Sequence, residues 1–438
     1  MICAWLDLRK KGHAKNHKDK KSGIFEKSYH RLKISLFIAK RIIGSKSYKN
    51  SVSAPIIKIG IIAISVGLIA MHIAIGTGIG FQNKIKDKIS SFEGHIRVST
   101  YENNSTNTTL ESIDPQMIRS AAETERISFV NSVAYASTVF KTDKNFAGGL
   151  LKGIDSTYRW NAFEDYLIDG RLPDIRSLIS REILLSKHIA RTLGVKTGDR
   201  VSSYFLFEDR LPIRRSFVVS GLYDSGFPDF DQRIAFADLR HVQKIYQWPT
   251  DQVGAYEITL DNFDDIHRFS EEVYDQVPAP YDVQHVKERY PEIFNWISLF
   301  DTNIALIIVI MIIVGGINMI TALLVLILER TQMIGLLGVL GMQQWSTQKV
   351  FLYNAAYLIG IGLLWGNVLG LGLLALQHQT GWITLDPTSY YVTTVPIAFD
   401  VPMITAINIG TFVICVLMLL IPSLIISKVT PIRALRRV

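Results

Sequence analysis

Cysteine is almost absent from this chain, and that absence limits the chemistry the chain can support. Only Cys3 and Cys415 occur among its 438 residues. Cys3 stands near the N-terminus and Cys415 lies inside an apolar run, so the two are poorly placed to pair. The sequence therefore indicates neither a disulfide framework nor a cysteine-ligated metal site.

Sequence motifs of catalysis are also missing. The chain contains no G-x-x-x-x-G-K-[ST] phosphate loop, no G-x-S-x-G nucleophile turn and no H-E-x-x-H zinc motif. Asp224, Asp229 and Asp231 cluster near Gly226 and Pro228, but without the EF-hand pattern we interpret them as a solvated turn rather than a metal site. We expect no catalytic residue, no metal and no cofactor bound by this chain.

What the chain has in excess is apolar sequence. Hydrophobic residues make up 48% and charged residues 20%, a combination typical of a membrane protein with a large water-exposed part. Four apolar runs have the length of about 20 residues that a bilayer-spanning helix needs. They cover residues 59–80, 302–328, 351–376 and 401–426.

The charge distribution predicts the orientation of these spans. Residues 1–57 hold 14 Lys and Arg against 3 Asp and Glu, whereas residues 59–328 hold 26 against 33. The tail from Lys428 is again basic, and the connection 377–400 has no Lys or Arg. By the positive-inside tendency both termini are cytoplasmic and the insert between the first two spans lies outside the cytoplasm. Residues 1–33 lack the apolar core of a cleavable signal, so the first span should be an uncleaved anchor.

The predicted fold class is an α-helical membrane protein with four transmembrane helices and a large α+β extracytoplasmic domain between the first and second. The segments before that domain are a basic extension (1–33), an interfacial helix (34–55) and the first span with an extension (56–91). We interpret the basic extension as a tail attracted to anionic membrane lipid rather than to nucleic acid. The later segments are the domain (92–292), the second span with a stalk (293–328), a cytoplasmic coupling helix (329–349), the third span (350–376), an outer loop (377–400), the fourth span (401–427) and a cytoplasmic tail (428–438).

Alternating patterns within residues 92–292 predict the elements of the α+β domain. Strands are expected at 95–99, 131–140, 148–153, 182–185, 200–207, 214–222, 255–260 and 281–285, and helices at 110–124, 186–193, 237–246 and 264–275. The stretch 206–212 should be a hairpin turn.

The first span is rich in small residues, which predicts close packing against a partner helix. His72 is the ionisable residue well inside it. A neutral imidazole hydrogen-bonded within the bundle is the simpler interpretation, and a proton relay is the alternative. Ala74, Thr77, Gly78 and Phe81 follow helical spacing and share one face at its outer end.

The segment 328–342 lies between the second and third spans and is too short and too polar at its start to cross a membrane. Met333, Ile334, Leu337 and Leu340 recur at helical spacing. The pattern predicts a short helix at the membrane face with an apolar side available to a partner.

The order of one span, a large domain and three more spans resembles the FtsX-like permeases of MacB-type ABC transporters. The resemblance rests on Gly80-Phe81 followed by His95-Ile-Arg-Val98, on Leu193-Gly-Val-Lys-Thr-Gly-Asp-Arg-Val201 and on Phe217-Val-Val-Ser-Gly-Leu-Tyr223. Two further motifs, Leu385-Asp-Pro-Thr-Ser-Tyr-Tyr391 and Thr430-Pro-Ile-Arg-Ala-Leu-Arg436, are similar to the lipoprotein-releasing, LolC/LolE-like branch.

The resemblance implies a permease that works with two copies of a separate ATPase, which would bind ATP and Mg²⁺, and with a second permease subunit of the same or a paralogous sequence. It further implies a lipoprotein substrate, a periplasmic lipoprotein carrier and a location in the bacterial inner membrane. The domain would consist of an outer lobe (92–154 and 254–292) enclosing an inserted lobe (155–253).

The site residues follow from the same resemblance. The ATPase would seat on Glu329, Arg330, Met333, Ile334, Leu337 and Leu340. Ala74, Thr77, Gly78, Phe81, Phe300 and Ile304 would line a cavity for the lipid tails of the substrate, and Phe207, Leu211 and Pro212 would bind the carrier. Met333 and Gly338 stand where the family commonly has an acidic residue and an Arg, so docking should depend on apolar packing together with Glu329 and Arg330.

Two alternatives remain at this point. The same machine could export another periplasmic compound or activate a cell-wall hydrolase. A membrane-anchored receptor or scaffold without an ATPase is the other interpretation.

Overall fold

The computed structural model describes residues 37–39, 41, 54–101, 113, 126–160, 163–176, 178–207, 211–277 and 279–424. The chain divides into two compact units. One, the helical unit, comprises Met1–Gly78, Asp301–Thr380 and Ile397–Val438, and the other, the α+β unit, comprises Ile79–Phe300 and Gly381–Pro396. The predicted basic extension, most of the predicted interfacial helix and the C-terminal tail lie outside the described residues.

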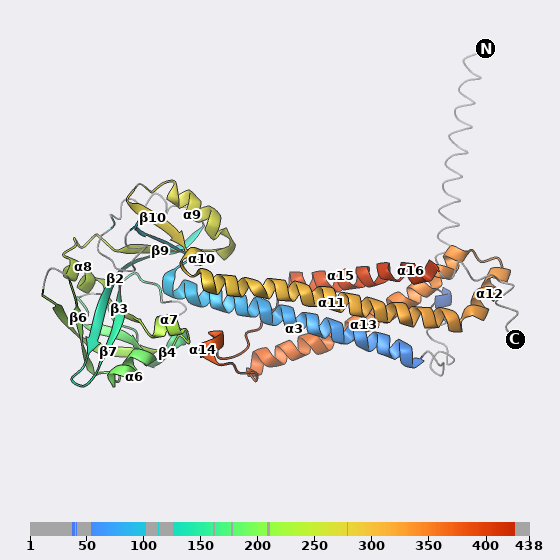
Figure 1. The fold of residues 1–438 in the computed structure, drawn as a ribbon, viewed down its shortest axis with the longest axis horizontal. Helices are drawn as coiled ribbons and strands as arrows, with labels where there is room; N and C mark the ends of the chain where they lie inside the picture. Colours follow the sequence, from blue (N-terminus) through green and yellow to red (C-terminus); the bar gives the residue numbers. More distant parts are fainter. Residues whose placement is uncertain are drawn as a thin grey trace, which may run out of the picture. The chain divides into compact units, whose positions relative to one another are not determined.

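Long apolar helices dominate the helical unit (Figure 1). The four predicted spans are confirmed, since four helices in the described part of the chain are long and apolar enough to cross a membrane. The helices are α3 (Ala54–Glu93), α11 (Pro291–Glu329), α12 (Thr331–Val339), α13 (Gln344–Thr380), α15 (Val401–Met418) and α16 (Leu420–Ser423). At 1.5 Å per residue, α3 and α11 are each about 60 Å long, which is about twice the hydrocarbon thickness of a bilayer.

Several predicted boundaries need correction. The third spanning helix begins at Gln344 and runs to Thr380, so residues 344–349 belong to it rather than to the coupling helix. This helix begins with polar residues, and hydropathy averaged along the sequence assigns such residues to the preceding loop. The fourth predicted span is observed from Val401 to Ser423, where the single residue Leu419 separates α15 from α16.

Glycines on α13 allow it to approach α3 closely. A Cβ atom on Gly362 would lie 2.8 Å from Ile64 Cγ2, and one on Gly366 would lie 2.8 Å from Leu68 Cβ. Gly370 repeats the spacing one turn later, with its Cβ position 3.1 Å from His72 Cδ2. The predicted close packing of the first span is thus made with α13, and glycines on both helices permit it, since a Cβ on Gly76 of α3 would lie 2.8 Å from Leu374 Cδ1 of α13.

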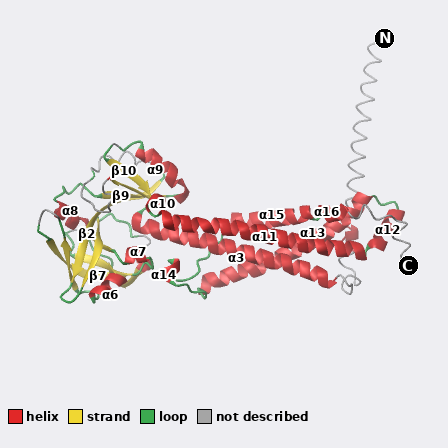
Figure 2. Ribbon diagram, in the orientation of Figure 1, coloured by secondary structure: helices red, strands yellow, loops and turns green. Residues whose placement is uncertain are grey.

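One mixed sheet of ten strands forms the α+β unit, in yellow in Figure 2. The strand order is β10-β1-β9-β2-β3-β8-β5-β7-β4, and β6 pairs with both β2 and β7. The strands are β1 (Ile96–Thr100), β2 (Ile127–Lys141), β3 (Phe146–Ile154), β4 (Leu167–Gly170), β5 (Glu182–Ser186), β6 (Arg200–Phe205), β7 (Ile213–Tyr223), β8 (Ile234–Asp238), β9 (Ala255–Leu260) and β10 (Tyr281–His285). The helices are η1 (Glu164–Tyr166), α6 (Lys187–Leu193), α7 (Pro228–Asp231), α8 (Leu239–Tyr246), η2 (Phe263–Asp265), α9 (Ile266–Tyr274), α10 (Val286–Arg289) and α14 (Pro387–Tyr390).

The long strand β2 joins two parts of this sheet. Its first half pairs with β9, and its second half pairs with β3 and, at Val139–Lys141, with β6. The strands from 92–154 and 254–292 occupy one end of the strand order and those from 155–253 the other. The two sets meet at the parallel pair β3 and β8 and again where β6 pairs with β2.

Predicted and observed elements agree for most of the domain, and the differences have local causes. Strand β8 was missed because its five residues are all buried and show no alternation. The predicted helix 110–124 lies outside the described residues except at Ile113, where the backbone pairs with Val253 as an isolated bridge instead.

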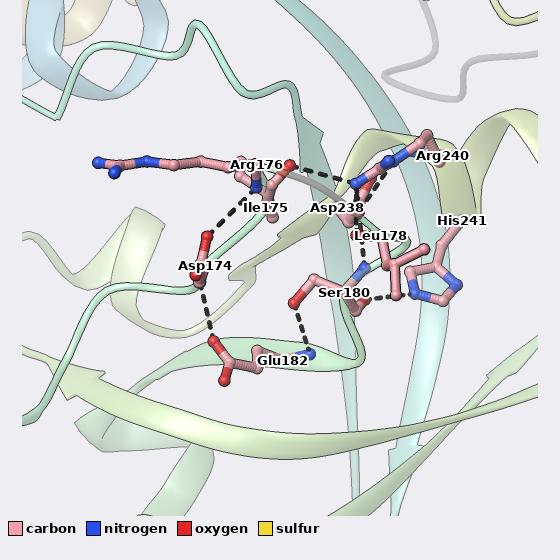
Figure 3. A network of polar contacts seen from close by, with 9 residues as sticks. All are labelled: Asp174, Ile175, Arg176, Leu178, Ser180, Glu182, Asp238, Arg240 and His241. Carbon is pink, nitrogen blue, oxygen red and sulfur yellow. Dashed lines mark hydrogen bonds and ion pairs between the residues drawn. The ribbon is translucent and has the colours of Figure 1, made fainter.

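A buried polar network fixes the loop that leads into β5 (Figure 3). The Asp238 carboxylate caps α8 by accepting from the Arg240 backbone N–H at 2.9 Å, binds the Arg240 guanidinium, and accepts from the Ser180 N–H at 2.8 Å. His241 Nε2 donates to the Ser180 carbonyl oxygen at 2.7 Å, and burial lowers the pKa of His241. Asp238 is therefore satisfied on both oxygens although it is buried.

Candidate functional site

The segment between the second and third spanning helices is a separate short helix. Helix α11 ends at Glu329, and α12 covers Thr331–Val339. Gly341, at φ +82°, ends the turn after α12 in a left-handed conformation that favours glycine, and the Met342 N–H donates to the Leu337 carbonyl at 2.9 Å. These two breaks set α12 off from both spanning helices.

The exposed side of this segment differs from the side that periodicity suggested. Ile334 is buried within the chain at 5% exposed, and Met333 and Leu337 are half-buried. Leu340 is 74% exposed. The other exposed apolar side chains are Leu336, Val339 and Trp345, and we name these three together with Leu340 the coupling face.

Two charged residues flank the coupling face. Glu329 is exposed at the end of α11, and Arg330 is half-buried with its Nε atom unpartnered among the described residues. Exposed apolar side chains close together in sequence, preceded by two charged residues, are typical of a protein docking site rather than of a water-facing turn.

The residues predicted to line a substrate cavity fall in different units. In the α+β unit the Phe81 and Phe300 rings stack at a centroid distance of 5.5 Å. In the helical unit Ile304 is buried, and Ala74 and Thr77 are half-buried, with the Thr77 hydroxyl donating to the Ile73 carbonyl at 2.7 Å. Gly78 is buried in the same helix. The structure thus brings the two aromatic residues together, and the cavity stays a prediction.

Polar side chains link three spanning helices inside the helical unit. His72 Nε2 lies 3.0 Å from Asn367 Oδ1, and Asn367 exchanges hydrogen bonds of 2.6 and 3.0 Å with Asn408. The Ser65 hydroxyl donates to the Gly362 carbonyl at 2.9 Å. His72 is therefore hydrogen-bonded within the bundle, with an amide rather than a carboxylate as its partner.

The hairpin between β6 and β7 exposes apolar residues at its tip. Leu211 is 88% exposed, and Leu206 and Pro212 are also exposed, while residues 208–210 lie outside the described residues. Phe207 packs edge-on against Tyr246 at a centroid distance of 5.9 Å, so it anchors the hairpin to the domain. Leu206 thus joins Leu211 and Pro212 as the accessible part of the predicted carrier-binding surface.

The acidic cluster near Gly226 is built as a turn. The Asp231 carboxylate accepts from the Ser225 backbone and hydroxyl, and Asp224 pairs with Lys187 at 2.9 Å. Among the residues described here, no group of three His, Cys, Asp or Glu side chains is arranged to hold a metal ion.

Two family models match the chain over most of its length. Residues 59–275 match the MacB-like periplasmic core domain, and residues 305–431 match the FtsX-like permease C-terminal domain. The chain belongs to the MacB-type, FtsX-like permeases. Because the described residues of this permease include four candidate spanning helices and, between the first and second of them in the chain, a periplasmic-type α+β domain, the predicted fold class is confirmed.

Similar proteins agree with this assignment. The permease is 22% identical over 420 residues to the lipoprotein-releasing system transmembrane protein LolC of Xylella fastidiosa (strain 9a5c), covering 92% of this chain and 98% of that protein. It is 24% identical to LolC of Haemophilus influenzae with the same coverage. The periplasmic region of MacB from Actinobacillus actinomycetemcomitans aligns with 46% of the permease and 92% of that structure at a TM-score of 0.31 and 10% identity, which is too weak to add to the argument. These relatives and the apolar helices make the permease a multi-pass inner-membrane subunit of an ABC transporter.

Sequence reasoning missed Leu336, Val339 and Trp345 in the coupling segment of the permease. Apolar residues occupy most positions from 333 to 342, so periodicity alone fits two faces equally well. The packing of α12 against α13, which buries Ile334, decides between the two faces. Asn367 and Asn408 were also missed, although an Asn in the middle of an apolar run is a visible signal.

Proposed function

We propose that this permease is the transmembrane subunit of an ABC transporter that releases lipoproteins from the inner membrane for transfer to a periplasmic carrier. The similarity to proteins named as lipoprotein-releasing LolC, over 92% of the chain, carries the proposal. The permease has no ATPase site of its own in this proposal. Two copies of a partner ATPase bind ATP and Mg²⁺, and a second permease subunit, identical or paralogous, completes the transporter.

The coupling face is the proposed seat of the ATPase. Positive-inside orientation puts both termini and α12 in the cytoplasm and the α+β domain in the periplasm. An ATPase that moves on ATP binding would push on α12, which directly follows α11. Because α3 and α11 are unbroken helices of 40 and 39 residues that enter the α+β domain, they are suited to carry that push out of the membrane.

Substrate and carrier have separate proposed surfaces. Lipid tails would enter beside the outer ends of α3 and α11. The residues proposed for this entry are Ala74, Thr77 and Gly78 on α3 and Ile304 on α11, which are close in sequence to the aromatic pair Phe81 and Phe300. The carrier would bind the exposed residues of the β6–β7 hairpin, Leu211 and Pro212 with Phe207 as their anchor.

Depletion of the permease tests the substrate. We expect mature lipoproteins to accumulate in the inner-membrane fraction after sucrose-gradient separation, and wild-type protein supplied in trans to restore their transfer. Chaining cells with normal lipoprotein sorting would instead indicate activation of a cell-wall hydrolase, and export of another compound would leave both sorting and division unchanged.

Acidic substitutions in the coupling face test the seat of the ATPase. Leu336→Asp with Leu340→Asp should lower the amount of ATPase that co-purifies in mild detergent by about tenfold or more, because each buries a charge in an apolar interface. The folded permease should be retained, since both side chains are exposed in the isolated chain. Leu178→Asp is the matched control, because Leu178 is 83% exposed in the α+β domain. Undiminished co-purification of the double variant would contradict this seat.

A further inference from the structure

A cavity inside the α+β domain is lined by arginine. Its volume is about 280 Å³, and it opens between the end of α3, the strands β1, β2 and β3, the segment from α7 to β8, and α10. Its lining includes Arg97, Arg233 and Arg289 together with the acidic residues Glu93 and Asp229. Since a water molecule takes up about 30 Å³ of liquid, this space exceeds the need of a few ordered waters.

One of these arginines has unmet hydrogen-bonding capacity. Arg97 is only 2% exposed, and its Nε and Nη2 atoms have no partner among the described residues. Its guanidinium lies over the ring of Tyr135, 4.5 Å from the ring centroid. Nε and one Nη form the edge of a guanidinium that donates two parallel hydrogen bonds to a planar or tetrahedral oxyanion.

The neighbouring charges are already paired with each other. Arg289 forms a buried ion pair with Glu93, and although burial lowers the pKa of Arg289, Glu93 more than offsets this and the pKa is raised. Behind the cavity Lys152 pairs with Glu257 at 2.7 Å. Among the described residues Arg97 forms no ion pair, and burial, followed by the charge of Arg289, lowers its pKa. A buried cation whose donors are unmet is costly, and an anion would satisfy it.

We propose that this cavity binds a phosphate group, held by the Nε–Nη2 edge of Arg97 with Arg233 at the mouth. Three guanidinium groups against two carboxylates leave one positive charge in the lining for the anion. A carboxylate has two oxygen atoms, which a single guanidinium edge can bind. A phosphate has further oxygen atoms that can accept hydrogen bonds from a second arginine. Arg233 is exposed, so it can meet the ligand as it enters.

An adjoining groove has room for an organic group attached to the phosphate. It shares Asp229, Arg289 and Tyr290 with the cavity and has a volume of about 390 Å³, and its lining combines the aromatic Trp296 and Tyr391 with the acidic Glu292. Phosphate in this cavity could thus belong to free inorganic phosphate or to the headgroup of an anionic phospholipid, and the two sources need separate experiments.

Calorimetry and hydrogen exchange on the full-length permease test the site. Inorganic phosphate titrated into detergent-solubilised protein should bind, and peptides covering β1 should exchange more slowly in its presence. Arg97→Gln should weaken binding about tenfold or more, because it removes charge-assisted hydrogen bonds in a buried site. Arg233→Gln should weaken it several-fold, and Arg200→Gln, an exposed arginine on β6 outside the cavity, should leave it unchanged.

Hydrogen exchange in lipid nanodiscs distinguishes a phospholipid headgroup from free inorganic phosphate. Protection of β1 in phosphatidylglycerol nanodiscs but not in phosphatidylcholine nanodiscs, without an effect of inorganic phosphate, would assign the site to a lipid headgroup. Protection by inorganic phosphate in either lipid would assign it to a soluble anion. Equal affinity of wild type, Arg97→Gln and Arg233→Gln, or no protection of β1 under any condition, would overturn the proposal. Arg233→Gln keeps the test decisive if Arg97→Gln does not fold.

Discussion

Replacing Lys152 with Met is expected to lower the free energy of unfolding of the α+β domain by about 3–5 kcal/mol, the usual cost of removing one partner from a buried ion pair. Lys152 and Glu257 are 0% and 1% exposed, and the ammonium lies 2.7 and 2.8 Å from the two carboxylate oxygens. Without Lys152 the carboxylate would stay buried with the Tyr135 hydroxyl as a remaining donor.

Hydrogen exchange on the full-length protein measures this effect in the domain itself, because peptides from β3 and β9 contain the two residues. The matched control is Lys187→Met, whose partner Asp224 lies at a similar distance of 2.9 Å but at the surface, so we expect a loss below about 1 kcal/mol. The double variant Lys152→Met with Glu257→Gln should be less destabilised than Lys152→Met alone, because the neutral amide can still accept from Tyr135. Equal losses for the buried and the exposed lysine would refute the argument.

The second large effect concerns Gly366 in the middle of α13. Gly366→Val should lower the free energy of unfolding of the helical unit by about 1–3 kcal/mol, the range for overpacking a close contact. A Cβ at this position would lie 2.8 Å from Leu68 Cβ and 3.1 Å from the Ser65 carbonyl oxygen. Relief requires α3 and α13 to move apart, which would also stretch the hydrogen bond between Ser65 and Gly362.

The same helix supplies a control of opposite sign. Gly360→Ala meets no atom within 4 Å, so the higher helix propensity of Ala should make it neutral or stabilising by up to about 1 kcal/mol. Thermal unfolding of both variants in one detergent compares them directly. If Gly366→Val and Gly360→Ala shifted the midpoint alike, the close approach of α3 and α13 would not be a source of stability.

The architecture of four spans and an inserted domain could be predicted from the sequence because the patterns that indicate it extend over many residues. Twenty apolar residues in a row, a basic end and an uncharged loop do not depend on tertiary contacts. A strand such as β9 can be predicted because apolar and polar residues alternate along it from Tyr256 to Leu260. Strand β8 has no alternation, since both its faces are buried, and nothing local distinguishes such a strand from the start of the following helix.

The candidate sites needed the structure because they depend on contacts distant in sequence. Which side of α12 faces outward is decided by α13, and an apolar segment offers no polar residue to mark the inner side. Arg97 looks like an ordinary strand residue in the sequence, and only the tertiary structure, which places its guanidinium over Tyr135 of β2 and in one cavity with Arg289 of α10, shows that it is a buried cation. In the same way, Gly362, Gly366 and Gly370 resemble flexible residues until α3 is placed against them.

The continuity of β2 has a mechanical consequence for the domain. Its 15 residues pair with β9 at one end and with β3 and β6 at the other, so a single extended strand belongs to both parts of the sheet. A hinge between those parts would have to bend this strand and open several of its hydrogen bonds, each contributing on the order of 1 kcal/mol. A load applied where β1 begins and β10 ends, the two places where the sheet adjoins α3 and α10, would therefore be transmitted through β2 to β6, and the β6–β7 hairpin would move together with β1.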